Sequence, residues 1–469
     1  MSLVKDDVDK GWSWLVLIAV YSGMAFVSIT TFMNGVFLVA LLDHYNEDLA
    51  KTTMIGALHA GLLCLLGPIV SVAMDMYSCR LCIVFGGFLL SSSYFISFFA
   101  NSIDMLIFTF GIIGGIGNSF AFIPLPIILA YYFRKWRNIV IALSQTTIGI
   151  SMFIASPFIV SLLETYGLKG SFLIVSGFVS HVCVCGLICM TNSEEIKIKR
   201  SKRRAHIHGD YLDSNDKVRQ FSKRLSGKFS FDLVTNIPLI LFLLSTFTWN
   251  FLLSACAMHL PKYMLYRGLG NSAIVTVMTI LGLCNTLGRF LAALTVGNGG
   301  LDSMTLHVGM LGVIGIITIL LPLYSKYSSA GFIFAALCGF YTGGPNSLMT
   351  PIIIRIIGME RLSAAHGLLY FSCGVGVISG PPFTGILFKL RGSYEFSFMI
   401  IGFVLLIGSF LGLLSSSKIE TESKNANEHD NKDEIVEEVG VNLELLQKER
   451  SLEENHVDVN GLSRNVEKI

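Results

Sequence analysis

Residues 169–190 read KGSFLIVSGFVSHVCVCGLICM, and residues 191–204 directly after them read TNSEEIKIKRSKRR. A helix of about 20 apolar residues is about 30 Å long, which matches the hydrocarbon core of a bilayer. The charged segment that follows belongs in water. Together the two segments predict a membrane-spanning helix that ends in a solvated loop.

Working outward from this boundary, five apolar stretches precede 169–190 and six follow the loop. Only helices that satisfy their own backbone hydrogen bonds, or closed barrels, cross a bilayer. We therefore predict an all-α polytopic membrane protein with twelve transmembrane helices in two six-helix bundles, a plan that resembles the major facilitator fold. The expected spans are 13–40, 52–75, 80–99, 103–130, 138–163, 169–190, 237–259, 271–297, 303–323, 328–353, 362–388 and 395–415.

Charge divides the chain into five expected regions. Only 14% of the residues are charged, against roughly 25% in soluble domains, which excludes an ordinary globular enzyme. The central loop holds eleven Lys or Arg against six acids, and the tail holds fourteen acids against seven bases. Such charge blocks predict solvated, weakly ordered segments. The regions are a cytoplasmic N-terminus (1–12), an N-terminal bundle (13–190), a basic cytoplasmic loop (191–236), a C-terminal bundle (237–415) and an acidic, disordered cytoplasmic tail (416–469).

Basic residues also predict the orientation in the membrane. Arg80, Arg134, Lys135 and Arg137 lie in short connections on the same side as the central loop and both termini. Loops rich in Lys and Arg stay on the cytoplasmic side. We expect a multi-pass protein of the plasma membrane with both termini in the cytoplasm and the lipid bilayer as its surroundings.

Four segments stand out, in order along 9–415: Asp9-Lys10-Gly11-Trp12-Ser13-Trp14; Tyr132-Phe133-Arg134-Lys135-Trp136-Arg137; Gly358-Met359-Glu360-Arg361-Leu362-Ser363; and Gly380-Pro381-Pro382 with Gly392-Ser393-Tyr394. They resemble signatures of the monocarboxylate transporter family (solute carrier family 16). The resemblance implies a carrier that moves its solute by alternating access between the two halves. The residues that carry signature or gating roles in this interpretation are Asp9, Gly11, Trp12, Trp14, Tyr132, Phe133, Lys135 and Arg137. The plainer interpretation of the tryptophans is an interfacial belt, and that of the basic residues is orientation alone.

Arg289 is the strongest candidate for binding a solute, because an ionisable residue deep in a span costs about 2.5–3.5 kcal/mol on insertion scales. Its planar guanidinium matches a carboxylate, and Asn285 lies four residues earlier on the same helix face. In the resembled family an arginine on this span engages the substrate carboxylate, and an aspartate at the Asn285 position takes part in proton coupling. A structural arginine bonded to backbone carbonyls is the alternative.

The proton-coupling residues that the resemblance implies are missing. Proton-coupled members have a lysine near the outer end of the first span, where this chain has Phe32, and Asn34 follows it. Phe32 and Asn34 therefore join Asn285 and Arg289 as substrate-binding candidates. The absent lysine and aspartate predict facilitative transport of a small organic anion or zwitterion.

Histidines offer a second route to proton coupling, since the unperturbed imidazole pKa is about 6.5. His59 and His366 are the candidates for a proton carrier, although an isolated histidine in a span is more often a core residue. Asn34, Asn118, Gln145, Asn250 and Asn346 are polar residues that either line a cavity or join helices.

Three functional hypotheses follow: a facilitative monocarboxylate carrier, a histidine-dependent proton symporter, and a receptor-like sensor on a transporter fold. No nucleophile–base pair and no metal-type cysteine spacing is visible in the sequence, so we expect no enzyme, cofactor or metal site. Nucleic acid is not an expected partner. Some members of the resembled family travel to the cell surface with a single-span immunoglobulin-like glycoprotein, which makes such a protein a candidate partner. The fold does not identify the solute.

Overall fold

The computed structural model describes residues 8–210, 231–297, 301–327 and 329–421. Most of the predicted acidic tail and part of the central loop lie outside these residues. The elements of the N-terminal half are α1 (Trp12–Phe32), α2 (Asn34–Tyr45), α3 (Leu49–Leu65), α4 (Gly67–Met76), α5 (Cys79–Ser97), α6 (Ile103–Leu106), the π-helix η1 (Ile107–Ile113), α7 (Gly114–Phe122), α8 (Pro124–Tyr132), α9 (Arg137–Ser144) and α10 (Thr146–Ile188).

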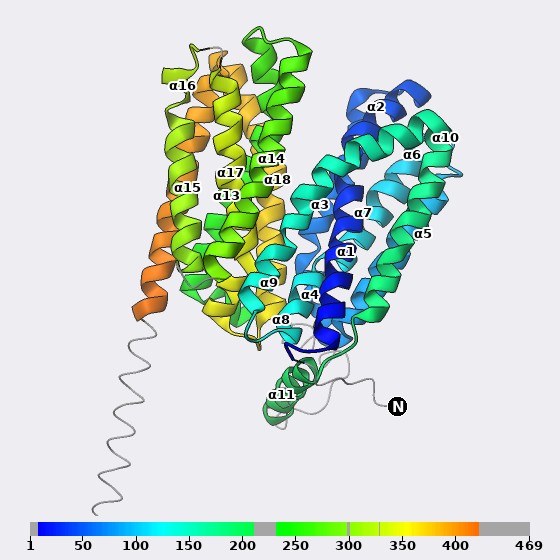
Figure 1. Ribbon diagram of the computed structural model, residues 1–469, viewed down its shortest axis with the longest axis vertical. Coiled ribbons are helices and arrows are strands. Elements are labelled where there is room, and N and C mark those ends of the chain that lie inside the picture. The colour runs from blue at the N-terminus through cyan, green and yellow to red at the C-terminus, as the bar shows by residue number, and fades with distance from the viewer. Residues whose placement is uncertain (1–7, 211–230, 298–300, 328, 422–469) are drawn as a thin grey trace, which may run out of the picture. The chain divides into compact units, whose positions relative to one another are not determined.

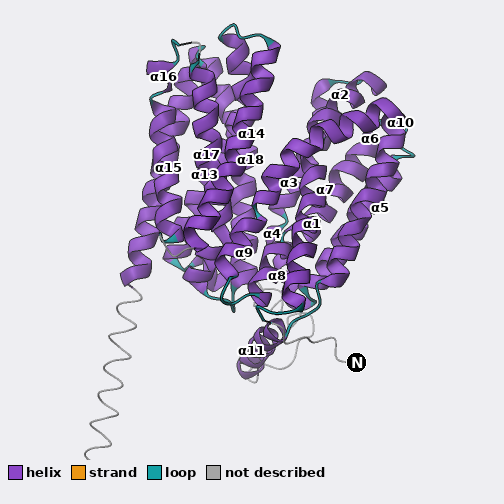
Figure 2. Ribbon diagram, in the orientation of Figure 1, coloured by secondary structure: helices purple, strands orange, loops and turns teal. Residues whose placement is uncertain are grey.

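The remaining elements begin with α11 of the central loop, and a final helix covers Tyr394–Thr421. They are α11 (Ser193–Asp210), the 3₁₀ turn η2 (Phe231–Val234), α13 (Ile237–Tyr266), α14 (Asn271–Gly297), α15 (Ser303–Ile319), α16 (Leu321–Tyr324), α17 (Ala330–Ile357) and α18 (Leu362–Arg391). Each element with assigned bounds is helical (Figure 2).

Helix occupies each of the predicted spans. Among the described residues, eight helices are long and apolar enough to cross a membrane, or nine if the bent pair α3 and α4 counts as one span. One of the eight, Arg137–Ile188, contains two predicted spans. Gly167, with φ 67°, interrupts the helical backbone between these two spans. The other two predicted spans are α15, with 17 residues, and α17. The all-α membrane fold predicted from the sequence is confirmed.

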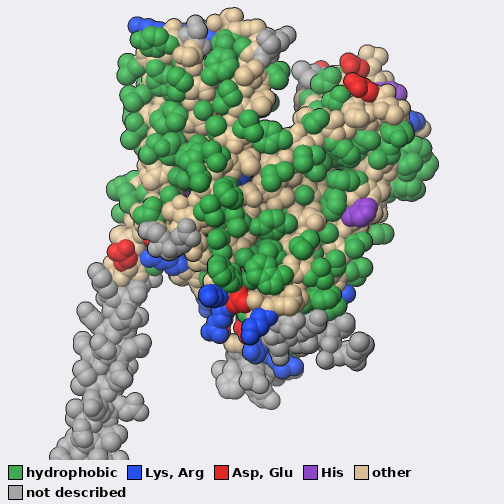
Figure 3. All heavy atoms as spheres, in the orientation of Figure 1, with side chains coloured by type: hydrophobic (Ala, Val, Ile, Leu, Met, Phe, Trp, Pro, Cys, Tyr) green, Lys and Arg blue, Asp and Glu red, His purple; other side chains and the backbone are tan. Residues whose placement is uncertain are grey.

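Two groups of helices stand next to each other in Figure 1, one built from α1–α10 and the other from α13 onward. The space-filling view shows the molecule hollowed between them at the end that carries α2 and α16 (Figure 3). At the opposite end, which carries α11, the groups meet. We call these the α2 end and the α11 end.

Glycines let the two halves touch along two seams. α3 and α4 pack on α18, and α9 and α10 pack on α14. In the first seam, a Cβ on Gly367 would lie 2.6 Å from the Gly67 carbonyl oxygen, so only glycine fits there. In the second, a Cβ on Gly149 would overlap the hydroxyl of Thr286. Small residues at such contacts allow membrane helices to approach closely.

A hydrogen bond reinforces the first seam at the α11 end. Ser363 Oγ, near the start of α18, donates to the Asp75 carboxylate at the end of α4 over 2.6 Å. This bond joins residues 288 positions apart in the chain and holds the two halves together at the α11 end.

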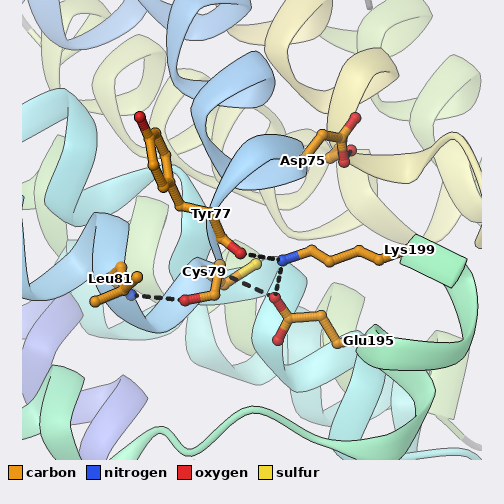
Figure 4. A network of polar contacts seen from close by, with 8 residues as sticks. Asp75, Tyr77, Cys79, Leu81, Glu195 and Lys199 are labelled. Atoms are coloured by element: carbon orange, nitrogen blue, oxygen red, sulfur yellow. Dashed lines mark hydrogen bonds and ion pairs between the residues drawn. The ribbon is translucent and has the colours of Figure 1, made fainter. Parts of the chain in front are cut away.

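The first part of the central loop is ordered, so the prediction of a solvated segment is wrong there. Glu195, on α11, is only 3% exposed. Its carboxylate accepts from the backbone N–H of Cys79 over 3.2 Å and from Lys199 Nζ over 2.8 Å, and Lys199 also donates to the Tyr77 carbonyl (Figure 4). The pair thus joins α11 to the connection between α4 and α5. Charge composition missed this contact because the buried pair is neutral as a unit.

This buried pair provides a stability prediction. We expect Glu195→Gln to lower the free energy of unfolding by about 1–3 kcal/mol, since Lys199 is left without its carboxylate. Thermal melting of the purified protein in detergent measures the effect. The neighbouring pair Lys197–Glu194 is solvent-exposed and serves as the control, because exposed pairs contribute about 0–1 kcal/mol. Equal melting shifts for Glu195→Gln and Glu194→Gln would contradict a structural role for the buried pair.

Candidate functional site

Arg289 lies inside the protein, where the two halves meet. It is 4% exposed and stands eight residues before the end of α14, or about 12 Å from the α11 end of that helix. Its Nε donates to Asn285 Oδ1 over 2.9 Å, and its Nη1 donates to the backbone carbonyl of Gln145 over 3.3 Å. The guanidinium of the C-terminal half is therefore held by a carbonyl of the N-terminal half.

A third oxygen comes from α17. With its amide turned so that the oxygen faces the guanidinium, Asn346 accepts from Arg289 Nη2 over 2.9 Å and from Nη1 over 2.5 Å. α17 is brought this close by its glycines, because a Cβ on Gly339 or Gly343 would overlap a backbone carbonyl of α14. Gly288 on α14 makes the reciprocal close approach to Phe340.

All three acceptors around Arg289 are neutral. Among the described residues, none of the ion pairs includes Arg289; arginines elsewhere in the same half pair with acids, as Arg355 does with Asp302 and Arg267 with Glu395. Amide and carbonyl oxygens solvate a guanidinium without cancelling its charge. The site thus keeps a positive charge in its interior.

Asn285 is fitted to this site as an amide. While its oxygen faces Arg289, its Nδ2 points to α17, 3.4 Å from the Gly339 carbonyl oxygen and 3.4 Å from Thr342 Oγ1. An ionised aspartate would place an acceptor oxygen against the Gly339 carbonyl, since a carboxylate has no proton to donate. The arrangement around Asn285 therefore suits an uncharged residue.

α18 contributes Tyr370 and His366 on one helix face, one turn apart. The Tyr370 side chain lies in the neighbourhood of Arg289, and its ring lies edge-on to Phe122 of the N-terminal half with centroids 6.0 Å apart. The His366 ring is 4.9 Å from the Tyr370 ring. The sequence analysis did not name Tyr370 as a candidate. Its position one turn from His366, which was a candidate, is the sequence feature that could have indicated it.

The two histidine candidates differ in their surroundings. His59 lies in the interior of the N-terminal half, where Nδ1 is 3.1 Å from the Phe110 carbonyl and Nε2 is 3.3 Å from Asn118 Nδ2. These distances fit a neutral ring that donates from Nδ1 and accepts at Nε2. Phe110 belongs to the π-helix η1, and π-helical turns interrupt the α-helical hydrogen-bond ladder. His59 therefore has a structural task, whereas both ring nitrogens of His366 lack partners among the described residues.

Phe32 and Asn34 lie at a break in the first span. α1 ends at Phe32, and α2 begins at Asn34 after Met33. The Asn34 Cβ would lie 3.4 Å from a Cβ on Gly56 of α3, so its side chain faces α3. Both amide atoms of Asn34 are buried without a hydrogen-bond partner among the described residues. Among the described residues, no hydrogen bond, ion pair or ring contact joins Phe32 or Asn34 to Arg289 or its three acceptors.

The first two signatures form one cluster at the α11 end. The Asp9 carboxylate accepts from the backbone N–H of Arg134 over 3.2 Å and of Lys135 over 2.9 Å. In return, the Asp9 N–H donates to the Tyr132 carbonyl over 3.1 Å. The first signature thus binds the turn between α8 and α9.

The aromatic members of these signatures close the same cluster. The Trp14 ring lies edge-on to Phe133 at 5.5 Å, and Trp12 Nε1 donates to the Ile188 carbonyl at the end of α10. Gly11 has φ 47°, a backbone conformation that favours glycine. Arg137 Nε donates to the Phe133 carbonyl over 2.9 Å. These contacts tie together helix ends of the N-terminal half, and none of them includes Arg289.

Comparison with known proteins gives the family. The Major Facilitator Superfamily model matches residues 20–327 and 304–453, which is most of the chain. The chain belongs to the Major Facilitator Superfamily. Monocarboxylate transporter 12 of Xenopus laevis is 25% identical over 419 residues, which cover 87% of this chain and 90% of the relative. Monocarboxylate transporter 2 of Meriones unguiculatus is 24% identical, with 85% and 83% covered. The resemblance to monocarboxylate transporters is thereby confirmed.

Solved structures show the same fold. The human organic anion transporter MFSD10 (TETRAN) superposes with a TM-score of 0.66 at 14% identity, and the match covers 86% of this chain and 100% of that one. A variant of the E. coli fucose:proton symporter FucP gives a TM-score of 0.61 at 13% identity, covering 86% and 99%. The chain is thus a membrane protein with the architecture of a transporter.

Proposed function

We propose that this superfamily member carries a small monocarboxylate across the membrane, with Arg289 as the anchor for the carboxylate. The observation that carries the proposal is a buried guanidinium held only by neutral oxygens in the described structure, between the two halves. The similarity to monocarboxylate transporters 12 and 2 supports the same solute class.

The geometry provides a mechanism for coupling binding to movement. In the structure, the bond from Arg289 Nη1 to the Gln145 carbonyl links the halves. A carboxylate makes charge-assisted, bidentate bonds that are roughly twice as strong as bonds between neutral groups. A solute that takes over the guanidinium therefore replaces this link and changes the balance between conformations, which is what a ligand with different affinities for two states must do.

We further propose that transport is facilitative. Asn285 stands next to Arg289 as an amide bonded to α17, and Phe32 occupies the position where proton-coupled members of the resembled family have a lysine. Neither side chain takes up or releases a proton in the physiological range. The solute would then move down its own gradient.

The α11 end is proposed as the cytoplasmic side, since the basic connection 134–137 and α11, the described start of the central loop, lie there. On this assignment the hollow in Figure 3 faces the outside. Plasma-membrane location, cytoplasmic termini and an immunoglobulin-like ancillary glycoprotein remain proposals that follow from the family resemblance.

Flux measurements test the proposed function. We expect proteoliposomes that contain the purified protein to take up labelled pyruvate saturably. The initial rates should vary less than about twofold between external pH 5.5 and 8, with the buffer otherwise the same inside and outside. Pyruvate stays ionised throughout this range. Binding of pyruvate without any flux would instead identify a sensor, and empty liposomes give the background.

A steep rise in uptake at low external pH would favour the alternative, a histidine-dependent symporter. The structure supports His366 over His59 for that role, because His59 already has partners at both ring nitrogens. His366 is buried, and burying a charged group without a partner is costly. This cost supports a neutral His366 and hence the facilitative proposal.

A further inference from the structure

His366 is the most poorly satisfied polar side chain near the proposed site. It is 1% exposed, and neither ring nitrogen has a hydrogen-bond partner among the described residues. A neutral imidazole carries one donor and one acceptor, and burying each without a partner is unfavourable. Each buried polar group without a partner calls for an explanation, and a polar group of a bound solute is one.

The position of His366 relative to Arg289 follows from the helices. Tyr370 and Arg289 each lie eight residues from the α11 end of their helix, α18 and α14 respectively, so they share one level. His366 lies one turn, about 6 Å, closer to the α11 end than Tyr370, on the same face of α18. Tyr370 stands between the two, since it lies in the neighbourhood of Arg289 and packs its ring on His366.

Resting on the proposed function, we propose that His366 is a specificity-determining residue that binds a second, uncharged polar group of the solute. The carrier then selects monocarboxylic acids that carry a hydroxyl or amide group three to five bonds from the carboxylate. A hydroxyl satisfies either ring nitrogen, because it both donates and accepts.

The second group is uncharged because the carboxylates of the described surroundings already have partners; Asp75 of α4, which faces α18, accepts from Ser363, one turn before His366. The ion pairs of the C-terminal half involve Asp302 and Glu395, which pair with Arg355 and Arg267. An ammonium group next to Arg289 would add a second buried positive charge. Zwitterionic amino acids with the amine at this distance are therefore disfavoured.

Competition measurements test the selection. The inhibition constants of 4-hydroxybutyrate and butyrate are measured against labelled pyruvate uptake in proteoliposomes at pH 7.5. These acids have the same carbon chain and differ by one hydroxyl group. We expect the unaltered protein to bind 4-hydroxybutyrate about tenfold more tightly, and His366→Phe to bring the ratio close to one while butyrate inhibition changes less than about twofold.

His181→Phe is the matched control, because His181 is exposed and lies in the N-terminal half, where its ring stacks on Phe26. This control must keep the tenfold ratio. Pyruvate flux with equal inhibition constants in the unaltered protein, or an unchanged ratio in His366→Phe, overturns the role of His366 and leaves the proposed function standing. If the unaltered protein takes up no pyruvate, so that neither acid has any uptake to inhibit, both the role of His366 and the proposed function are overturned. His366→Gln separates hydrogen bonding from ring shape, and a partly retained ratio in that variant supports the hydrogen bond.

Discussion

Replacing Arg289 with glutamine is expected to reduce carboxylate transport at least about thirtyfold. Removing one partner of a buried, hydrogen-bonded charge pair costs about 2–5 kcal/mol, so uptake at low solute concentration should fall between about thirtyfold and more than a thousandfold. Glutamine still reaches polar neighbours but brings no charge. Initial rates of labelled pyruvate uptake, normalised to protein in the liposomes, measure the loss.

Two further variants control this result. Arg391→Gln removes an arginine that stacks on Phe396 at the far end of α18, and it should leave uptake unchanged. Arg289→Lys keeps the charge but loses the planar fork, so we expect an intermediate loss of roughly tenfold or more. Uptake within twofold of the unaltered protein in Arg289→Gln would remove the anchor and assign Arg289 a purely structural role.

The depth of Arg289 in an apolar span was readable from the sequence, and its surroundings were only partly so. A spacing of four residues placed Asn285 on its face, because this relation is local to one helix. Gln145 and Asn346 appeared only as polar residues with an undecided role. Their convergence on one guanidinium depends on how α10, α14 and α17 pack, and packing between distant segments is not visible in a single apolar pattern.

The ends of the helices show the same limit. Hydropathy predicted the stretches that form long apolar helices, since the cost of exposing charge to lipid acts on each stretch separately. It did not reveal the break at Met33 or the π-helix η1, because an apolar sequence looks the same on both sides of such a break. The ordered start of the central loop was missed for a related reason. Glu195 and Lys199 cancel each other's charge only once α11 docks on the connection between α4 and α5.

The seam between the halves must open and close in an alternating-access carrier, so its tightest contacts should be as sensitive as the binding site. Gly67 and Gly367 face each other across α4 and α18 with room for hydrogen atoms only. Ser71, one turn along α4, lies 2.7 Å from the position of a Cβ on Gly367. A larger side chain cannot enter without separating the two helices, because packed interiors absorb very little extra volume.

Gly367→Val is therefore expected to reduce uptake at least about tenfold, because overpacking of about 1–3 kcal/mol would oppose closure of the α11 end. It should also make Ser71→Cys, buried in the unaltered protein, react with a maleimide added from the α11 side, above the labelling of the native cysteines in the same background. Gly309→Val on α15 is the control, since a Cβ there meets nothing within 4 Å. Normal uptake in Gly367→Val would show that the halves part without this contact. Reduced uptake with Ser71→Cys still unreactive would place the fault in folding rather than in the seam.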